Sequence, residues 1–167
     1  MFSLLSGFYD YLTRRPEYYV LILGLDNAGK TTLSEQFKVL NRPGYKARSR
    51  TAPTVGLNGQ YCVRITFWDL GGQAELQELW PNYYEECHGI IYVVDSADRA
   101  RLEESRIAFD AMVSEKPLEG LPILVVCNKQ DIEDAMTIAE VKGVFNQSAY
   151  KLGVRDCKVH SISATNG

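Results

Sequence analysis

The sequence is poor in the residues that stabilise small secreted domains or hold structural metal ions. Its 167 residues include four cysteines, without a Cys-x-x-Cys pair, and two histidines, so neither a disulfide framework nor a zinc site is expected. The apolar runs, such as residues 20–23, are much shorter than the roughly 20 residues that span a bilayer. The net charge of −3 excludes the basic surface that binds nucleic acid. What remains is one globular domain of a reducing, intracellular compartment.

The first dozen residues carry an amphipathic pattern of their own. Large apolar residues recur near helical spacing: Met1, Phe2, Leu4, Leu5, Phe8, Tyr9 and Leu12. The positive charges of Arg14 and Arg15 follow the apolar part, which is the reverse of a secretory signal. Residue 2 is Phe, so the glycine that N-myristoylation requires is absent. We expect an amphipathic helix over residues 1–15, which either packs on its own domain or lies on a membrane surface.

From Tyr18 onward, short apolar stretches alternate with longer amphipathic ones. The pattern predicts strands over residues 18–23, 63–69, 90–95, 121–128 and 158–163, and helices over 29–40, 101–113 and 138–150. This alternation indicates an α/β fold, a mostly parallel sheet with helices on both faces. Ligands bind such sheets at the carboxyl ends of the strands. The loop over 42–54 is long enough to have a function.

Residues 24–31 match the phosphate-binding pattern G-x-x-x-x-G-K-[ST] between a predicted strand and a predicted helix, which is the context that the pattern requires. Glycines let the loop wrap with its N–H groups inward, and the helix N-terminus adds partial positive charge. Lys30 is expected to reach the terminal phosphates and stabilise charge during catalysis, and the Thr31 hydroxyl to bind Mg²⁺. The nucleotide-binding residues predicted here are Gly24, Asp26, Asn27, Ala28, Gly29, Lys30, Thr31 and Thr32.

Two later segments favour guanine over adenine. Asn128, Lys129 and Asp131 follow a predicted strand, where the Asp131 carboxylate can accept two hydrogen bonds from guanine. Adenine lacks that donor pair and would leave the carboxylate unpaired, at a cost of roughly 1–3 kcal/mol or more. Ala164 and Thr165 follow the last strand, where a backbone N–H can meet the guanine carbonyl.

A third element, after the strand over 63–69, predicts hydrolysis. Asp69 at the strand end is expected to hold Mg²⁺ through a water, and Gly72 lets a backbone N–H approach the γ-phosphate. Gln73 is then placed to orient an attacking water, which makes it a predicted catalytic residue beside Lys30. No arginine is obviously placed by these motifs to act on the phosphates, so unassisted turnover is expected to be slow.

Together these motifs resemble the small GTPases of the ADP-ribosylation factor (Arf) and Arf-like group, over residues 4–167. The resemblance rests on five segments: residues 24–31, 53–56, 68–73, 94–99 and 128–131. Within the group, the Met1-Phe2 start and the Glu-Cys-His-Gly of residues 86–89 are similar to the Arf-related branch that works at the Golgi. The resemblance implies the P-loop small-GTPase fold, with GTP or GDP and Mg²⁺ as cofactors.

The resemblance also implies roles that the residues alone do not. Thr54 would bind Mg²⁺ only when GTP is present, and Leu57, Trp68 and Tyr83 would form the apolar surface that effectors read. The other expected partners are an exchange factor, a GTPase-activating protein, and a membrane receptor or membrane surface contacted by the helix over 1–15. The protein would then be cytoplasmic and peripheral on Golgi membranes. That family continues into a final helix, so we expect residues 16–167 to form the GTPase domain without it.

The leading hypothesis is a GTP-binding and slowly GTP-hydrolysing switch that recruits partners to Golgi or endomembranes for vesicle trafficking. One alternative is a nucleotide kinase, which would lack the segment 128–131 and would carry an arginine-rich lid that we do not find. The other alternative is a module that holds GTP without significant hydrolysis, against which Gln73 argues weakly.

Overall fold

The structure, a computed structural model, describes residues 16–40 and 64–166. Several predictions fall outside the described residues: the helix over 1–15, the loop over 42–54, and the roles of Thr54 and Leu57. In the part of the chain that the structure describes, no helix is both long enough and apolar enough to cross a bilayer.

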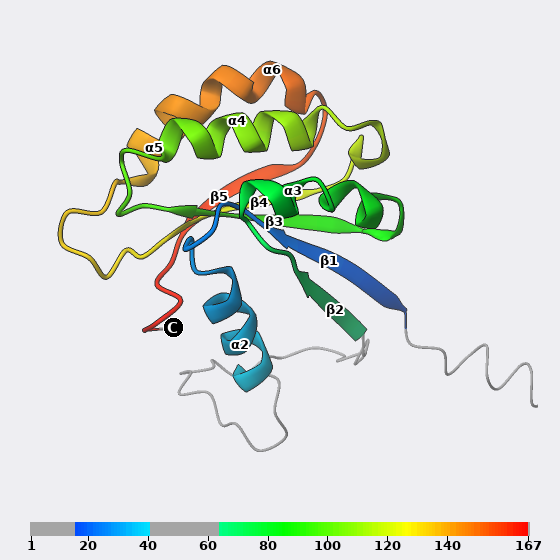
Figure 1. Cartoon of the computed structure of the whole chain (residues 1–167), viewed down its shortest axis with the longest axis horizontal. Coiled ribbons are helices and arrows are strands. Elements are labelled where there is room, and N and C mark those ends of the chain that lie inside the picture. The colour runs from blue at the N-terminus through cyan, green and yellow to red at the C-terminus, as the bar shows by residue number, and fades with distance from the viewer. Residues whose placement is uncertain (1–15, 41–63, 167) are drawn as a thin grey trace, which may run out of the picture.

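Five parallel strands form one sheet, as the alternating pattern predicts (Figure 1). The strands are β1 (Glu17–Leu23), β2 (Arg64–Asp69), β3 (Gly89–Asp95), β4 (Ile123–Asn128) and β5 (Cys157–Ser161), in the spatial order β2-β1-β3-β4-β5. The central strand β3 is buried along almost its whole length, because helices cover both faces of the sheet. All five strands end at the same edge, so the loops that follow them meet there.

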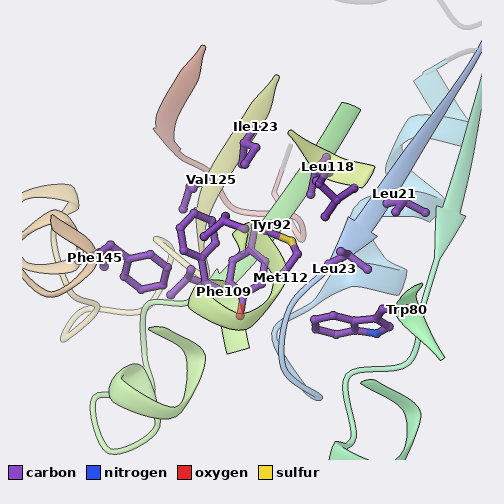
Figure 2. Close-up of a cluster of buried hydrophobic side chains, with 14 of the residues drawn as sticks. Leu21, Leu23, Trp80, Tyr92, Phe109, Met112, Leu118, Ile123, Val125 and Phe145 are labelled. Carbon is purple, nitrogen blue, oxygen red and sulfur yellow. The ribbon is translucent and has the colours of Figure 1, made fainter. Parts of the chain in front are cut away.

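Helices cover both faces of the sheet, which confirms the predicted α/β class. Helix α2 (Lys30–Leu40) covers one face, and α4 (Leu102–Val113), α5 (Ile138–Phe145) and α6 (Ala149–Leu152) cover the other (Figure 1). The larger core lies under α4 and α5, where Tyr92 and Phe109 meet edge to face with ring centroids 5.1 Å apart (Figure 2). The smaller core lies under α2, where Phe37 stacks on Phe67.

The helix predicted over residues 138–150 is interrupted in the structure. Helix α5 begins with a capping box in which Thr137 and Glu140 bond each other's backbone N–H groups, and it ends at Phe145. A short 3-10 turn, Asn146–Ser148, then leads into α6. Asn and Ser are weak helix formers because their side chains compete for backbone groups, which accounts for the break.

Two short elements after β2 were not predicted. Helix α3 (Ala74–Gln77) and the 3-10 helix η1 (Trp80–Glu86) fold back against the sheet and bury Trp80 and Tyr84. The indole Nε1 of Trp80 donates to the Gly71 carbonyl oxygen at 2.9 Å. This contact holds the segment after β2 beside the sheet edge where the strands end.

Candidate functional site

The loop after β1 has the backbone conformation that the phosphate-binding pattern requires. Gly24 lies at φ +137°, and a Cβ there would sit 2.2 Å from the Val93 carbonyl oxygen. Gly29 lies at φ +92°, where a Cβ would meet the Asn128 side chain at 2.2 Å. Asn27 lies at φ 61°. Both glycines are therefore required, by backbone conformation and by space.

Lys30 is buried beneath this loop, with 7% of its surface exposed. Its Nζ donates to the carbonyl oxygens of Gly24 at 3.0 Å and Leu25 at 2.7 Å. Burial lowers the pKa of this ammonium, and the negative charges of Asp69 and Asp26 oppose that shift. A buried cation whose hydrogen bonds go to neutral carbonyls is suited to receive an anionic group at this point.

Thr31 and Asp69 lie side by side, although they are 38 residues apart. The Thr31 hydroxyl donates to Asp69 Oδ2 at 2.7 Å. A hydroxyl and one carboxylate are hard oxygen ligands of the kind that Mg²⁺ takes when phosphates complete its shell, so these residues fit the predicted ion. Among the described residues no cluster of three His, Cys, Asp or Glu side chains could hold a metal.

Gly72, the second of the two glycines after β2, lies against the phosphate loop. A Cβ on Gly72 would sit 2.3 Å from the Gly24 carbonyl oxygen and 2.4 Å from the backbone nitrogen of Asp26. The Gln77 side-chain amide donates to the Gly72 carbonyl at 2.9 Å, which helps to hold this close approach. Gln73 follows, exposed, at the N-terminal cap of α3. Together these segments line a cleft of about 260 Å³ beside Lys30 and Thr31.

At the other end of the site, Asn128 joins three loops. Its side chain is buried, with Nδ2 donating to the Ala28 carbonyl at 2.8 Å and Oδ1 accepting from the Ala164 backbone N–H at 2.9 Å. The segments after β1, β4 and β5 are therefore tied by one amide. Sequence reasoning assigned Asn128 to nucleotide contact, and the structure adds that both ends of the amide serve this connection.

Lys129 and Asp131, which were predicted to contact the guanine nucleotide, also form hydrogen bonds with other side chains. The Ser163 hydroxyl donates to Asp131 Oδ1 at 2.6 Å and accepts from the Asn166 backbone N–H at 3.2 Å. Lys129, at φ 65°, donates from Nζ to Asp95 Oδ2 at 2.6 Å. Asp131 and Thr165 remain exposed at the surface, and Thr32 likewise in the first turn of α2. The predicted guanine-reading carboxylate is thus oriented by a serine on the adjacent loop.

Sequence reasoning missed Arg101, which contacts the phosphate loop from the start of α4. Its Nη2 donates to Asp26 Oδ1 at 2.7 Å, and this hydrogen bond is the main reason that the pKa of the Asp26 carboxyl is lowered. Glu104, one turn along the helix, holds the same guanidinium. The two partners Asp26 and Arg101 are 75 residues apart, so no local pattern could have paired them.

Two of the three predicted effector residues are in contact. The rings of Trp68 and Tyr83 meet edge to face at 5.5 Å, and Tyr19 stacks on Trp68 at 4.8 Å. Tyr83 is 38% exposed. Sequence reasoning did not include Tyr19, because its place beside Trp68 follows from the pairing of β1 with β2.

Three hollows in the described part of the chain are larger than the phosphate-side cleft and lie away from its residues. One, of about 490 Å³, lies between α5 and β5, and a second, of about 540 Å³, lies beside the loop after α4. The third, of about 320 Å³, lies beside Gly89 and Pro122. The phosphate-side cleft is smaller because a loop of backbone N–H groups receives a phosphate at the surface rather than in an enclosed cavity. We therefore place the candidate site by its chemistry rather than by its volume.

Comparison with known proteins gives one consistent result. The sequence profile of the ADP-ribosylation factor family matches residues 4–167. The chain is 53% identical over 173 aligned positions to ADP-ribosylation factor-related protein 1 of Bos taurus, an alignment that covers 100% of this chain and 86% of the relative. It is 50% identical to the protein of the same name from Homo sapiens, with the same coverage. It is 43% identical to ADP-ribosylation factor-like protein 3 of Saccharomyces cerevisiae, covering 100% of this chain and 87% of that one.

Proposed function

Because this chain belongs to the ADP-ribosylation factor family of GTP-binding switch proteins and GTPases, we propose that it hydrolyses GTP slowly and recruits partners to Golgi or other endomembranes. The observation that carries the nucleotide part is the buried Asn128 amide, which joins a phosphate loop to the segment that holds Asp131. A loop for phosphates and a carboxylate for guanine are thereby held at one edge of the sheet. This arrangement supports binding of a guanine nucleotide across the two ends.

We assign the parts of hydrolysis to the residues at the phosphate end. The Lys30 ammonium neutralises the terminal phosphates, and Gly72 offers a backbone N–H to the γ-phosphate. Thr31, and Asp69 through a water, would hold Mg²⁺, which when bound would offset negative charge on the phosphate oxygens. Gln73 orients the water whose oxygen attacks the γ-phosphorus as the bond to the β-phosphate oxygen breaks. GDP and phosphate leave, and both protons of the water remain on the phosphate as H₂PO₄⁻.

The contacts of Arg101 support the proposal that unassisted hydrolysis is slow. The guanidinium of Arg101, which reaches the phosphate loop, is engaged by Asp26 and Glu104. A cation engaged by two carboxylates does not provide free charge for the developing transition state. We propose that an activating protein supplies this charge, and that an exchange factor releases GDP.

The proposal extends to the membrane and to effectors. Trp68 and Tyr83, whose rings are in contact, are proposed as part of the effector surface, together with Leu57.

The amphipathic segment over 1–15 is proposed to attach residues 16–167, the GTPase domain, to Golgi membranes. Deleting residues 1–13 should leave nucleotide binding intact and abolish Golgi recruitment in cells. A deletion that stays on the membrane, or that no longer holds nucleotide, would show that this segment packs on the domain instead.

The hydrolysis proposal is tested by nucleotide analysis and one substitution. Chromatography of the purified, denatured protein should release GDP or GTP rather than adenine nucleotides. Gln73→Leu should keep GTP binding and slow hydrolysis stimulated by an activating protein by about a hundredfold, because only the orientation of water is lost. Gln147→Leu, an exposed glutamine outside the site, serves as the matched control.

The alternative of a module that holds GTP without hydrolysis predicts a different result. Wild-type protein and Gln73→Leu would then consume GTP equally slowly with every activating protein tried. Gln73 is exposed and lines the phosphate-side cleft, where its side chain can contact a water. This position favours the hydrolytic proposal over the alternative.

A further inference from the structure

We propose that Arg101 is a positioning residue for the phosphate loop, which holds the Asp26 carboxylate away from the nucleotide and so sets the relative affinity for GTP and GDP. This inference rests on the proposed function, since it assumes that the loop holds a guanine nucleotide. Its starting observation is the contact between α4 and the loop, in which Arg101 Nη2 donates to Asp26 Oδ1 at 2.7 Å.

Asp26 places a negatively charged side chain in a loop that is proposed to bind anionic phosphates. The loop otherwise offers backbone N–H groups, a helix N-terminus and the Lys30 ammonium, all of which attract phosphate. A carboxylate in the same loop repels phosphate, and its hydrogen bond to Arg101 lowers its pKa, so protonation does not remove the negative charge near neutral pH. The side chain is 44% exposed, so it can turn unless a partner holds it.

Three further hydrogen bonds, to Glu104 and Asp98, fix Arg101 itself. Its Nε donates to Glu104 Oε2 at 2.9 Å, and its Nη2 donates to Glu104 Oε1 at 3.0 Å. Its backbone N–H donates to Asp98 Oδ1 at 3.2 Å. Glu104 lies one turn further along α4, so the helix sets the direction of the guanidinium. The arginine therefore acts as a rigid holder for Asp26 rather than as a mobile surface cation.

The arrangement has an electrostatic consequence that depends on the nucleotide. Repulsion between charges grows with the charge of the ligand, and GTP carries more negative charge on its phosphates than GDP. If Arg101 is removed, the Asp26 carboxylate is no longer neutralised and can turn toward the phosphates. The loss of affinity should be larger for GTP than for GDP, whereas a merely structural role would weaken both equally.

The experiment measures affinities and dissociation rates of fluorescent GTP and GDP for the full chain, four test variants and one control variant. Arg101→Ala should weaken GTP binding by about fivefold, the upper range for a partly exposed charge pair, and GDP binding by less. In the Asp26→Asn background the same Arg101→Ala change should have no further effect, because no carboxylate remains to be held. Arg101→Lys should restore part of the GTP affinity.

The matched control is Arg106→Ala on the same helix. Arg106 pairs with Glu103 at 2.7 Å, three residues apart, and makes no contact with the phosphate loop in the described structure. This variant loses a similar helical ion pair, so its GTP and GDP affinities should equal those of the wild type.

Three results would overturn the inference. One is an Arg101→Ala variant whose ratio of GTP to GDP affinity equals that of the wild type. A second is a loss of GTP affinity on adding Arg101→Ala to Asp26→Asn that is as large as the loss on adding Arg101→Ala to the wild type. Arg101 would then act without Asp26. A third is wild-type protein that binds neither GTP nor GDP, which would overturn the proposed function as well and is recognised before any variant is compared.

Discussion

The form of the phosphate end of the site is set mainly by its backbone conformation, whereas the base end is held together by side chains that bond to neighbouring loops. After β1, two glycines at positive φ and a buried lysine determine the form of the loop. After β4 and β5, Asn128 and Asp131 already have partners on neighbouring loops. The base end is thus assembled by the fold, and the phosphate end holds a buried cation without a hydrogen-bonded anionic partner.

This difference assigns affinity and specificity to different ends. A buried ammonium bonded to carbonyls gains most when an anion arrives, so the phosphate end should supply most of the binding free energy. On the proposed function, the base end would discriminate because a base other than guanine does not offer Asp131 its pair of hydrogen-bond donors. Asn128 is the contact through which one end can influence the other.

The largest effect is expected from removing the cation of the phosphate end. Lys30→Met should weaken GTP and GDP binding by about a hundredfold or more, since breaking a desolvated charge contact costs about 2–5 kcal/mol. Titration with fluorescent nucleotide measures the loss. Lys38→Met, which removes an exposed lysine of the same helix, is the control. Equal nucleotide affinity in Lys30→Met and wild type would refute the assignment of affinity to this end.

The same variant should alter how stability depends on pH. Burial lowers the pKa of Lys30 below its ordinary value of 10.5, so the charged form is penalised in the nucleotide-free protein at neutral pH. That penalty disappears as the pH rises from the folded-state pKa to 10.5. The free energy of unfolding should therefore rise over this window in wild-type protein, and Lys30→Met should lack that rise.

Asn128→Ala is expected to have a smaller effect on nucleotide affinity, but to disturb both the phosphate end and the base end of the site. The change leaves the Ala28 carbonyl and the Ala164 N–H without their partner, at a cost of about 2–4 kcal/mol in the free energy of unfolding. Urea unfolding without nucleotide measures this, and affinity for GTP and GDP should fall together. Asn82→Ala, at an exposed position of η1, is the control. A variant that loses stability but binds both nucleotides normally would show that the two ends are independent.

The smallest effect on overall binding is expected from Asp131→Asn. The amide can no longer accept both guanine hydrogen bonds, so GTP affinity should fall by about tenfold to a hundredfold. Binding of xanthosine triphosphate should improve, since its ring carries the complementary group. Competition among GTP, xanthosine triphosphate and ATP measures the change, with the exposed Asp134→Asn as control. If ATP affinity fell as well, Asp131 would support the phosphate end rather than read the base.

The parts of the fold that sequence reasoning predicted are those that local chemistry determines. The five strands and the helices after β1 and β3 follow from apolar periodicity, and the structure has them within two residues of the predicted ends in most cases. The break after Phe145 was missed, because periodicity continues across the weak helix formers Asn146 and Ser148. The elements α3 and η1 were missed because they are stabilised by contacts such as that of Trp80 with Gly71.

By itself the sequence determined the conformation of the phosphate loop, since positive φ at Gly24 and Gly29 is a property of the residues themselves. It also determined that a carboxylate, Asp131, follows the strand that became β4. Only the tertiary structure decided that Asn128 joins three loops, that Ser163 orients Asp131, and that Arg101 holds Asp26. These contacts join residues far apart in the chain, and the order of strands in the sheet, rather than any local preference, brings them within hydrogen-bond distance.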